Sequence, residues 1–440
     1  MKKILPASAI IILIILFNSC EKVDLPDFGH HNPPGKSYDA GVAVAWIKLQ
    51  QQISKTTPGF SPGVTGRAFG YSGITLYESV QPGFPGYQSL ASQLAGSLTL
   101  PAINKHDKYY WPASANRAMA IITRNLFAAT TPANKFSIDS LETSFNTKFQ
   151  TEAPAAEITR AVDFGGQIAT AIFDWSKTDG SLAVYPPYVP PAGSGLWIPT
   201  PPAFAPAAAP YQGTFRSFIT GIADKAALPP PIAYSDVPGS AFYNMANEVY
   251  TLSLSLTAYD TTTVRFWADL PGQFNGPAHF TSVLSQLIEK ENLHLGEAAI
   301  AYAKHGIAIT DAGIACFKTK YQYNLIRPIS YIRSVLSHPS WNAVIATPPH
   351  PEYSSAHAII MQATAEVLKD IFGSHYSFTD HSFDVTYGSR HYNSFDEYAW
   401  EGAWSRVIGG IHYKPTAYAG IQQGKKVGVW VNKLKFHGND

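Results

Sequence analysis

Two cations near the end of an expected helix are the first residues whose types and spacing could do chemistry. Lys320 and Arg327 lie seven residues apart, and Pro328 follows directly. Seven residues make close to two helical turns, so the spacing predicts both side chains on one helix face. Because Pro328 moves the preceding residue away from helical geometry, Arg327 is expected at the helix end, free to turn inward. The pair could bind an anion, although such pairs also occur on solvated helix faces.

A second group stands at the start of another expected helix. The tetrapeptide Ser354–His357 precedes the apolar run 358–372, and Gly373 follows where a helix C-terminus often has glycine. The free N–H groups and the dipole of a helix N-terminus favour an anion. Ser355 adds a hydroxyl donor and His357 an imidazole. The same residues would also suit a plain serine N-cap beside a surface histidine.

The third group combines small residues, a cation and an imidazole. Ser405, Gly409 and His412 are spaced for one helical stripe, and Arg406 on a neighbouring face is long enough to reach around. The pair Gly409 and Gly410 would let a ligand or another backbone approach closely. A packing interface between helices is the alternative interpretation.

Taken in order, the three groups resemble the signature of the vanadium-dependent haloperoxidases. The pattern is Lys-x6-Arg-Pro, then Ser-x-His, then Ser-Arg-x5-His, and the type-2 phosphatidic acid phosphatase superfamily shares it. The resemblance extends upstream to Asp311-Ala-Gly-Ile and Lys318-Thr-Lys. It implies a helical bundle of the haloperoxidase and acid phosphatase type. The helical periodicity along the chain, without a run of alternating strands, also predicts an all-α fold.

The resemblance further implies a vanadate cofactor, whose site phosphate may also occupy. Lys320, Arg327 and Arg406 would neutralise the oxygens of this tetrahedral anion. Guanidinium forks suit such oxygens better than point charges. The Ser355 hydroxyl and the backbone N–H of Ala356 would donate to the same oxygens.

Three of these positions would be catalytic. His412 would bond to the vanadium, His357 would act as general acid–base, and Lys320 would polarise bound peroxide. The resemblance therefore implies oxidation of bromide or iodide by hydrogen peroxide. A histidine-nucleophile phosphatase acting on a periplasmic phosphomonoester is the enzymatic alternative. A non-catalytic oxyanion-binding lipoprotein is the other.

Two departures from the family pattern motivate the last alternative. Ala356 stands where the family has glycine, and a positive φ there would strain it. Thr416 stands where the family tends to place an aspartate that orients the apical histidine.

Two further residues are expected to line the pocket. His350, seven residues before His357, corresponds to a position that tends to be histidine in bromoperoxidase-like members, which favours bromide or iodide. Phe317 lies one turn before Lys320. A surface loop for His350 and core packing for Phe317 are the alternatives. The spacing Glu291-x-x-His294 with Glu297 resembles half of a di-iron site, but no second such motif accompanies it.

Composition limits the classes of partner. With 32 Lys plus Arg against 31 Asp plus Glu, the formal net charge is +1, which indicates neither nucleic acid nor an anionic membrane surface as partner. Anion selectivity must therefore come from local clusters. Cys316 is predicted to be a small buried residue, and the sequence leaves the oligomeric state open.

The N-terminus predicts export. A basic start, the apolar run 4–17 and a small residue before Cys20 resemble a bacterial lipoprotein signal over 1–20. Cys20 would then carry the lipid, residues 21–38 would be a tether, and the protein would be a periplasmic or outer-membrane lipoprotein. An ordinary cleaved signal peptide is the alternative.

The rest, residues 39–440, is predicted to form one helical domain. Helical patterning runs to about residue 180 and returns in the C-terminal half, 236–440, with one stripe over 284–302 and a separate helix from Asp311. Between them, residues 185–211 contain nine prolines interleaved with aromatic residues. This segment predicts an ordered strap across the helices, or alternatively a polyproline helix for a partner.

Overall fold

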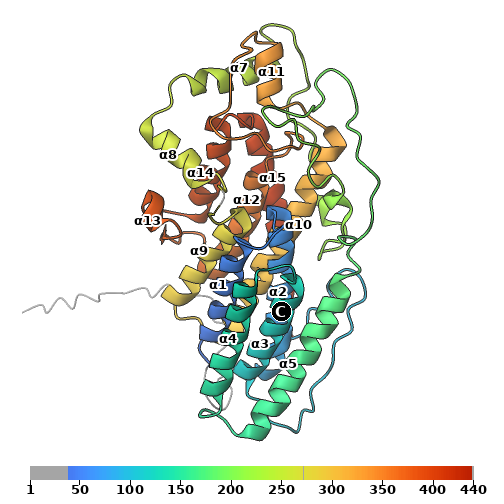
Figure 1. Ribbon diagram of the computed structural model, residues 1–440, viewed down its shortest axis with the longest axis vertical. Helices are drawn as coiled ribbons and strands as arrows, with labels where there is room; N and C mark the ends of the chain where they lie inside the picture. Colours follow the sequence, from blue (N-terminus) through green and yellow to red (C-terminus); the bar gives the residue numbers. More distant parts are fainter. Residues whose placement is uncertain (1–37, 271, 439–440) are drawn as a thin grey trace, which may run out of the picture. The chain divides into compact units, whose positions relative to one another are not determined.

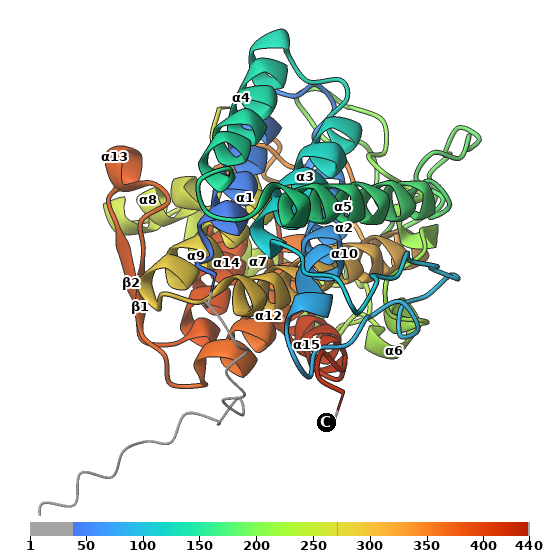
Figure 2. The same cartoon turned by 90° about the horizontal axis from the view of Figure 1, so that it is seen from below.

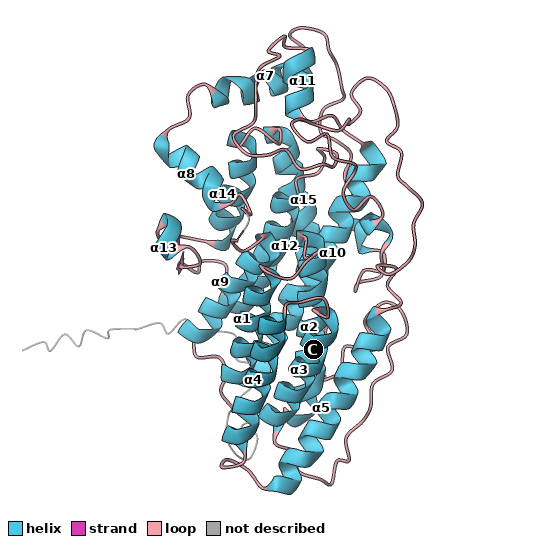
Figure 3. Cartoon of the chain, viewed as in Figure 1, coloured by secondary structure: helices cyan, strands magenta, loops and turns pink. Residues whose placement is uncertain are grey.

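Helices make up nearly all the regular structure of the protein (Figures 1 and 3). The computed structural model describes residues 38–270 and 272–438, and within them fifteen α-helices accompany one two-stranded sheet. The all-α fold predicted from the sequence is confirmed. None of the helices described is both long and apolar enough to cross a membrane.

The N-terminal part folds into five helices and one short 3-10 turn, η1. In chain order they are α1 (Gly41–Ser54), α2 (Pro62–Val80), η1 (Gln81–Gly83), α3 (Trp111–Leu126), α4 (Pro132–Phe149) and α5 (Ala155–Ser176). The predicted apolar stripe of α5 is its buried face, which includes Ala161, Ile168 and Ile172. This face packs against α3, and α3 in turn packs against α2.

The remaining chain supplies ten helices, a second 3-10 turn and the sheet. They are η2 (Gln212–Thr214), α6 (Ile222–Ala226), α7 (Ala241–Ser253), α8 (Ala258–Phe266), α9 (Gly276–Lys290), α10 (Leu295–Tyr323), α11 (Pro328–Ser334), α12 (Ala356–Phe372), β1 (Phe378–Asp380), α13 (Asp384–Tyr387), β2 (Arg390–Tyr392), α14 (Phe395–Ile408) and α15 (Lys414–Val431). The strands pair antiparallel, with Phe378 opposite Tyr392.

Helix α10 joins the two parts of the fold. It packs against α2 on one side and against α12 and α15 on the other, as Figure 2 shows. Glycines permit the close contact with α2, since a Cβ at Gly73 would lie 2.4 Å from the carbonyl oxygen of Tyr302. Helices α10, α12 and α14 carry most of the residues that the sequence singled out for chemistry.

Two helix boundaries differ from the sequence prediction. The stripe over 284–302 belongs to two helices, because the His294 side chain caps α10 and accepts from the backbone N–H groups of Gly296 and Glu297. The separate helix expected from Asp311 was also wrong, since α10 is continuous from Leu295 to Tyr323. The Asp311 carboxylate does not cap a helix; it accepts from the backbone N–H groups of Phe218 and Ile219.

The proline-rich segment 185–211 forms no helix or strand, and it packs against the chain around Arg327. Trp197 is fully buried, and its backbone N–H donates to the carbonyl of Asn324 at 2.6 Å. The backbone N–H of Ala208 donates to the carbonyl of Pro349 at 2.7 Å. The segment therefore holds in place two loops that lead into the cluster described below.

The described residues from 38 onward form one compact unit. The lipoprotein signal over 1–20 with Cys20, and all of the tether except Tyr38, lie outside the described residues. These two interpretations stay predictions.

Candidate oxyanion site

Lys320 and Arg327 are both buried in the same region, but they do not lie on one helix face as the spacing predicted. Helix α10 ends at Tyr323, and Asn324 takes a left-handed φ of 48° that turns the chain. Lys320 therefore lies in the last turn of α10, whereas Arg327 is the N-cap residue of α11. Both side chains are fully buried.

The Arg327 guanidinium connects three distant segments of the chain. Its Nε donates to the carbonyl of His350 at 2.8 Å, and its Nη1 donates to the carbonyl of Ile411 at 2.7 Å. The same Nη1 lies 3.3 Å from Nε2 of His412. Lys320 reaches the second segment too, because its Nζ donates to the carbonyls of Pro351 and Glu352 at 2.9 and 3.0 Å.

His412 lies in the turn after α14, and not on the helical stripe that its spacing predicted. The helix ends at Ile408, and Gly410 takes a φ of 81°. Nδ1 of His412 lies 2.8 Å from Oε1 of Glu352. Because a carboxylate accepts, Nδ1 carries the proton and Nε2 keeps its lone pair. Burial and the charges of Arg327 and Lys320 hold the pKa of His412 well below its usual value, so the ring is neutral.

Glu352 is one of two candidate site residues that the sequence prediction missed. Its Oε1 accepts from three donors: His412 Nδ1, the backbone N–H of Tyr413 at 3.1 Å, and the hydroxyl of Thr416 at 2.5 Å. Thr416 therefore does not leave His412 without an orienting carboxylate, because its hydroxyl helps to hold the Glu352 carboxylate in place. A sequence signal existed, since Glu352 is the only Asp, Glu, Lys or Arg between Arg333 and Glu366.

This geometry predicts the effect of Glu352→Gln. A neutral amide should make Nε2 of His412 less basic while leaving the surrounding cations in place. We therefore expect the ratio of vanadate to phosphate affinity to fall by about 10- to 100-fold, because only vanadate forms a bond to the ring. Competitive calorimetry measures both affinities. Glu366→Gln on α12 is the matched control, and an unchanged ratio in Glu352→Gln would show that another group orients His412.

Ser355 and Ala356 stand at the N-terminus of α12, as predicted. Ser355 is the N-cap residue and Ala356 the first helical residue, whose φ is not positive. Alanine at this position therefore carries no strain. Oγ of Ser355 is buried without a hydrogen-bond partner in the described structure.

His357 faces a second carboxylate that the sequence did not indicate. Its Nε2 lies 3.5 Å from Oδ2 of Asp269, longer than a normal hydrogen bond, and this buried nitrogen has no hydrogen-bond partner in the described structure. Burial and the charge of Arg406 lower the pKa of His357, whereas Asp269 opposes that shift. No sequence pattern links Asp269 with His357, because they lie in separate segments between α8 and α9 and in α12.

Arg406 borders the same centre from the last turn of α14. Its side chain is 5% exposed, and its Nη1 donates to the carbonyl of Trp267. Its positive charge contributes to the lowered pKa values of His357, His350 and His412 alike. The backbone carbonyl of Arg406 also accepts from the backbone N–H groups of Ile411 and His412 at 3.1 and 3.2 Å, so Arg406 lies beside His412.

The charges of this cluster favour an anion. Three buried cations, Lys320, Arg327 and Arg406, face two carboxylates, Glu352 and Asp269. Burial and the charge of Arg327 lower the pKa of Lys320 to about 7. A third positive charge in this cluster is therefore unfavourable without a bound anion. A bound oxyanion would offset that excess and give Ser355 Oγ and His357 Nε2 the partner they lack. The residues present therefore fit vanadate or phosphate.

His350 and Phe317 adjoin the cluster. Nη2 of Arg327 donates to Nδ1 of His350 at 2.9 Å, and burial holds the pKa of His350 well below its usual value. The ring centroid of Phe317 lies 5.4 Å from that of His350. His350 lies in the loop before α12 and is partly exposed, and its hydrogen bond with Arg327 holds it against the cluster.

The Glu291-x-x-His294 spacing with Glu297, which resembles half of a di-iron site, has a structural explanation. The backbone N–H of His294 donates to Glu297 at 3.0 Å, which completes the capping of α10. In the part of the chain that the structure describes, no three His, Cys, Asp or Glu residues form a group able to hold a metal ion. Cys316 is buried, as predicted, and its thiol donates to the carbonyl of Ser354 at 3.4 Å.

Comparison with known proteins gives consistent results. The family model for the VCPO second helical-bundle domain matches residues 301–437. The chain is 30% identical to a structure described as the first bacterial vanadium-dependent iodoperoxidase, with a TM-score of 0.81 over 92% of this chain and 98% of that one. Holo- and apo-type structures of a bacterial vanadium-dependent chloroperoxidase share 15% identity and a TM-score of 0.68. They cover 91% and 90% of this chain and 98% of their own, and show likeness of fold. A search of curated proteins finds no match.

Proposed function

Since this chain belongs to the vanadium-dependent haloperoxidases, we propose that it holds vanadate in the cluster around His412 and oxidises bromide or iodide with hydrogen peroxide. The protein is a peroxide-using oxidoreductase with a vanadate cofactor. One observation carries the assignment of the site: Glu352 fixes the tautomer of His412 so that Nε2 offers a lone pair beside buried cations.

The cations and donors would hold the cofactor. Lys320, Arg327 and Arg406 would balance the negative charge of its oxygens, and burial strengthens each of these interactions. The Ser355 hydroxyl and the N–H of Ala356 would donate to the same oxygens at the start of α12. His412 would bond through Nε2. When bound, vanadate supplies a Lewis-acid centre that makes peroxide reactive toward halide without a change of oxidation state.

His357 is the group positioned to move a proton. Its Nε2 is buried without a hydrogen-bond partner in the described structure. The lowered pKa of His357 keeps the ring neutral, so the ring can accept a proton. Asp269, 3.5 Å away, would stabilise the imidazolium that forms. Burial alone would raise the pKa of Asp269, but its interaction with the neighbouring His357 and the charge of Arg406 outweigh burial and lower it, so this carboxylate stays ionised.

The choice of halide is part of the proposal. His350, hydrogen-bonded to Arg327, occupies the position that favours bromide or iodide in the family resemblance. The similar structure with 30% identity is named an iodoperoxidase. Iodide and bromide are also easier to oxidise than chloride, so we propose iodide or bromide and not chloride as the substrate.

A paired assay tests this function. Vanadate-free protein is loaded with vanadate and given peroxide, iodide or bromide, and a halogen acceptor; a second sample without vanadate receives a generic phosphomonoester. Vanadate-dependent halogenation supports the proposal. Hydrolysis of the phosphomonoester that vanadate inhibits would support the phosphatase instead. No activity in either assay, with vanadate binding retained, would support a non-catalytic binding protein. Two departures in the sequence favoured the last outcome, but the structure removes both. Ala356 has no positive φ, and Glu352 supplies a carboxylate beside His412.

The pKa of Lys320 predicts a pH dependence of anion binding. Since burial lowers that pKa to about 7, Lys320 is charged below pH 7 and loses its charge as the pH rises. Sulfate affinity should therefore fall above pH 7, approaching about tenfold per pH unit if only charged Lys320 binds. Sulfate is a suitable probe because its own charge is constant in this range. The site histidines have lowered pKa values and stay neutral there.

Lys320→Arg is the matched control for this titration, since arginine keeps its charge across the range. Its sulfate affinity should be nearly independent of pH between about 6 and 9. A pH dependence that persists unchanged in Lys320→Arg would assign the titration to another group.

Location is proposed from the N-terminal sequence alone. Export and acylation of Cys20 would leave the enzyme on a lipid anchor in the periplasm or at the outer membrane. The mass of the N-terminal peptide from membrane-extracted protein tests this, because an unmodified Cys20 would contradict it.

A further inference from the structure

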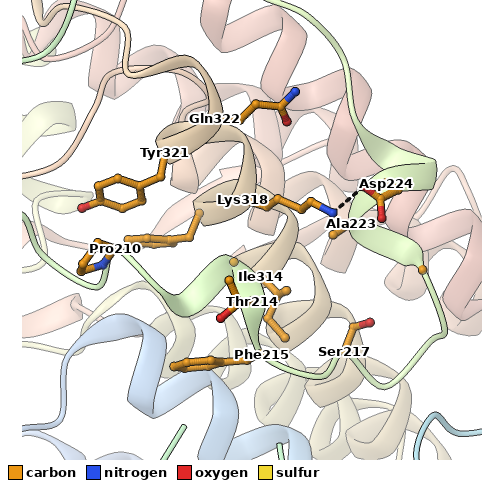
Figure 4. A pocket seen from close by; sticks show the side chains of 13 residues that line it. Pro210, Thr214, Phe215, Ser217, Ala223, Asp224, Ile314, Lys318, Tyr321 and Gln322 are labelled. Carbon is orange, nitrogen blue, oxygen red and sulfur yellow. Dashed lines mark hydrogen bonds and ion pairs between the residues drawn. The ribbon is translucent and has the colours of Figure 1, made fainter. Parts of the chain in front are cut away.

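A pocket of about 510 Å³ lies beside α10, on the face that carries Phe317. One wall consists of α10 residues at helical spacing, Ile314, Phe317, Lys318 and Tyr321. The opposite wall is the chain from Pro210 to Asp224, which includes η2 and α6 (Figure 4). Cavities of this size are typical of small-molecule sites.

The pocket lining suits a flat, uncharged ring. Phe215, Phe317, Tyr321 and Ile314 supply apolar and aromatic surface from both walls. The one cation, Lys318, is already paired with Asp224 at 2.5 Å, so the pocket offers no unpaired charge for an anionic ligand. An aromatic ligand can therefore bury its faces here without desolvating an unpaired charge.

Several oxygens of the lining keep acceptor capacity. The Thr214 hydroxyl donates to the carbonyl of Tyr211, and the Ser217 hydroxyl donates to that of Ile219, both at 2.7 Å. Each hydroxyl oxygen keeps lone pairs, and the Asp224 carboxylate accepts from Lys318 with further lone pairs to spare. A ligand that brings its own O–H or N–H donor is therefore complementary to this lining.

Phe317 links the pocket to the oxyanion site. Its side chain lines the pocket, and its ring lies 5.4 Å from the ring of His350. His350 in turn accepts a hydrogen bond from Arg327. A molecule held in the pocket is thus separated from the oxidising centre by two aromatic side chains.

We propose that this pocket binds the organic acceptor of the halogen, a phenol-type aromatic compound with one or two rings. The inference rests on the proposed function. Peroxide oxidises iodide to hypoiodous acid, with uptake of a proton and release of water. A ring carbon of the acceptor then forms the C–I bond as its C–H bond breaks, and the displaced proton and the hydroxide of hypoiodous acid leave as a second water. The pocket determines which ring carbon meets the oxidant first.

Binding of 1-naphthol to the vanadate-free protein tests the pocket independently of any reaction. Calorimetry should show saturable binding with a dissociation constant of about 1 mM or tighter. Ala223→Leu adds side-chain volume at a pocket-lining position and should weaken binding by about tenfold or more. Thr214→Leu does the same at an exposed position, so it tests the pocket even if the α6 variant folds poorly. Ala156→Leu, at an exposed position on α5, is the matched control.

The vanadate-loaded protein gives the second readout. With peroxide and iodide, wild type should iodinate 1-naphthol with a ratio of 2- to 4-product that differs from that of reagent hypoiodous acid. Ala223→Leu and Thr214→Leu should oxidise iodide at the wild-type rate. Their ratio of 2- to 4-product should equal that obtained with reagent hypoiodous acid. Unchanged affinity in both filling variants, or no saturable binding to wild type, overturns the inference. Saturable binding that both filling variants weaken, in a protein that oxidises no halide, upholds the pocket and contradicts the proposed function instead.

Discussion

Replacement of His412 by alanine is expected to abolish vanadate retention and to lower halide oxidation by at least about 10³-fold. Nε2 of His412 is the nitrogen positioned to bond the cofactor, and Glu352 holds it in that tautomer. The cations remain in the variant, so sulfate, which forms no bond to the ring, should still bind within about threefold of wild type. Measurements of vanadium content after gel filtration and of sulfate affinity by calorimetry separate the two effects.

His391→Ala provides the control for this variant, because His391 is exposed on β2, outside the cluster. It should retain vanadium and full activity. Stoichiometric vanadium in His412→Ala would remove the bond to this histidine from the mechanism. Loss of sulfate binding together with vanadate would instead indicate collapse of the site, and the thermal unfolding midpoint would report it.

Arg406→Ala should weaken the binding of any tetrahedral oxyanion by about 2–4 kcal/mol, or roughly 30- to 1,000-fold. The side chain is 5% exposed, and its charge reaches three imidazoles of the site. Its removal should also raise the pKa of His357, because Arg406 is the main charge that lowers it after burial. The pH profile of halide oxidation should then shift to higher pH together with the loss of affinity.

Arg265→Ala is the control for charge alone, since Arg265 is exposed at the end of α8. Arg406→Lys keeps the charge without the fork, and we expect it to recover part of the affinity. Equal oxyanion affinity in Arg406→Ala and wild type would exclude this guanidinium from the site.

The sequence predicted the members of the site better than their placement. Helix α12 begins and ends where serine, small residues and Gly373 indicated, because capping is local and depends on neighbouring residues. The three groups of cations and imidazoles were also found from local spacing. Their convergence was not derivable from spacing, since Arg327 lies outside α10 and His412 lies outside α14.

The partners of the histidines depend on contacts that no local pattern encodes. Glu352 is 60 residues from His412 in sequence, and Asp269 comes from another part of the chain altogether. The family pattern pointed to the residue four places after His412, and Thr416 there indicated a defect. The structure supplies the carboxylate from the segment before α12, with Thr416 as one of its donors. A residue that departs from a family pattern can therefore mark a substitution of partner and not a loss of function.

Diffraction from a crystal soaked in vanadate, with the anomalous signal of vanadium, tests the central claim most directly. The account predicts one strong peak bonded to Nε2 of His412, with Ser355 Oγ and the side chains of Lys320, Arg327 and Arg406 within hydrogen-bonding reach of its oxygens. A vanadium peak elsewhere, with His412 still bonded only to Glu352 and Arg327, would contradict it.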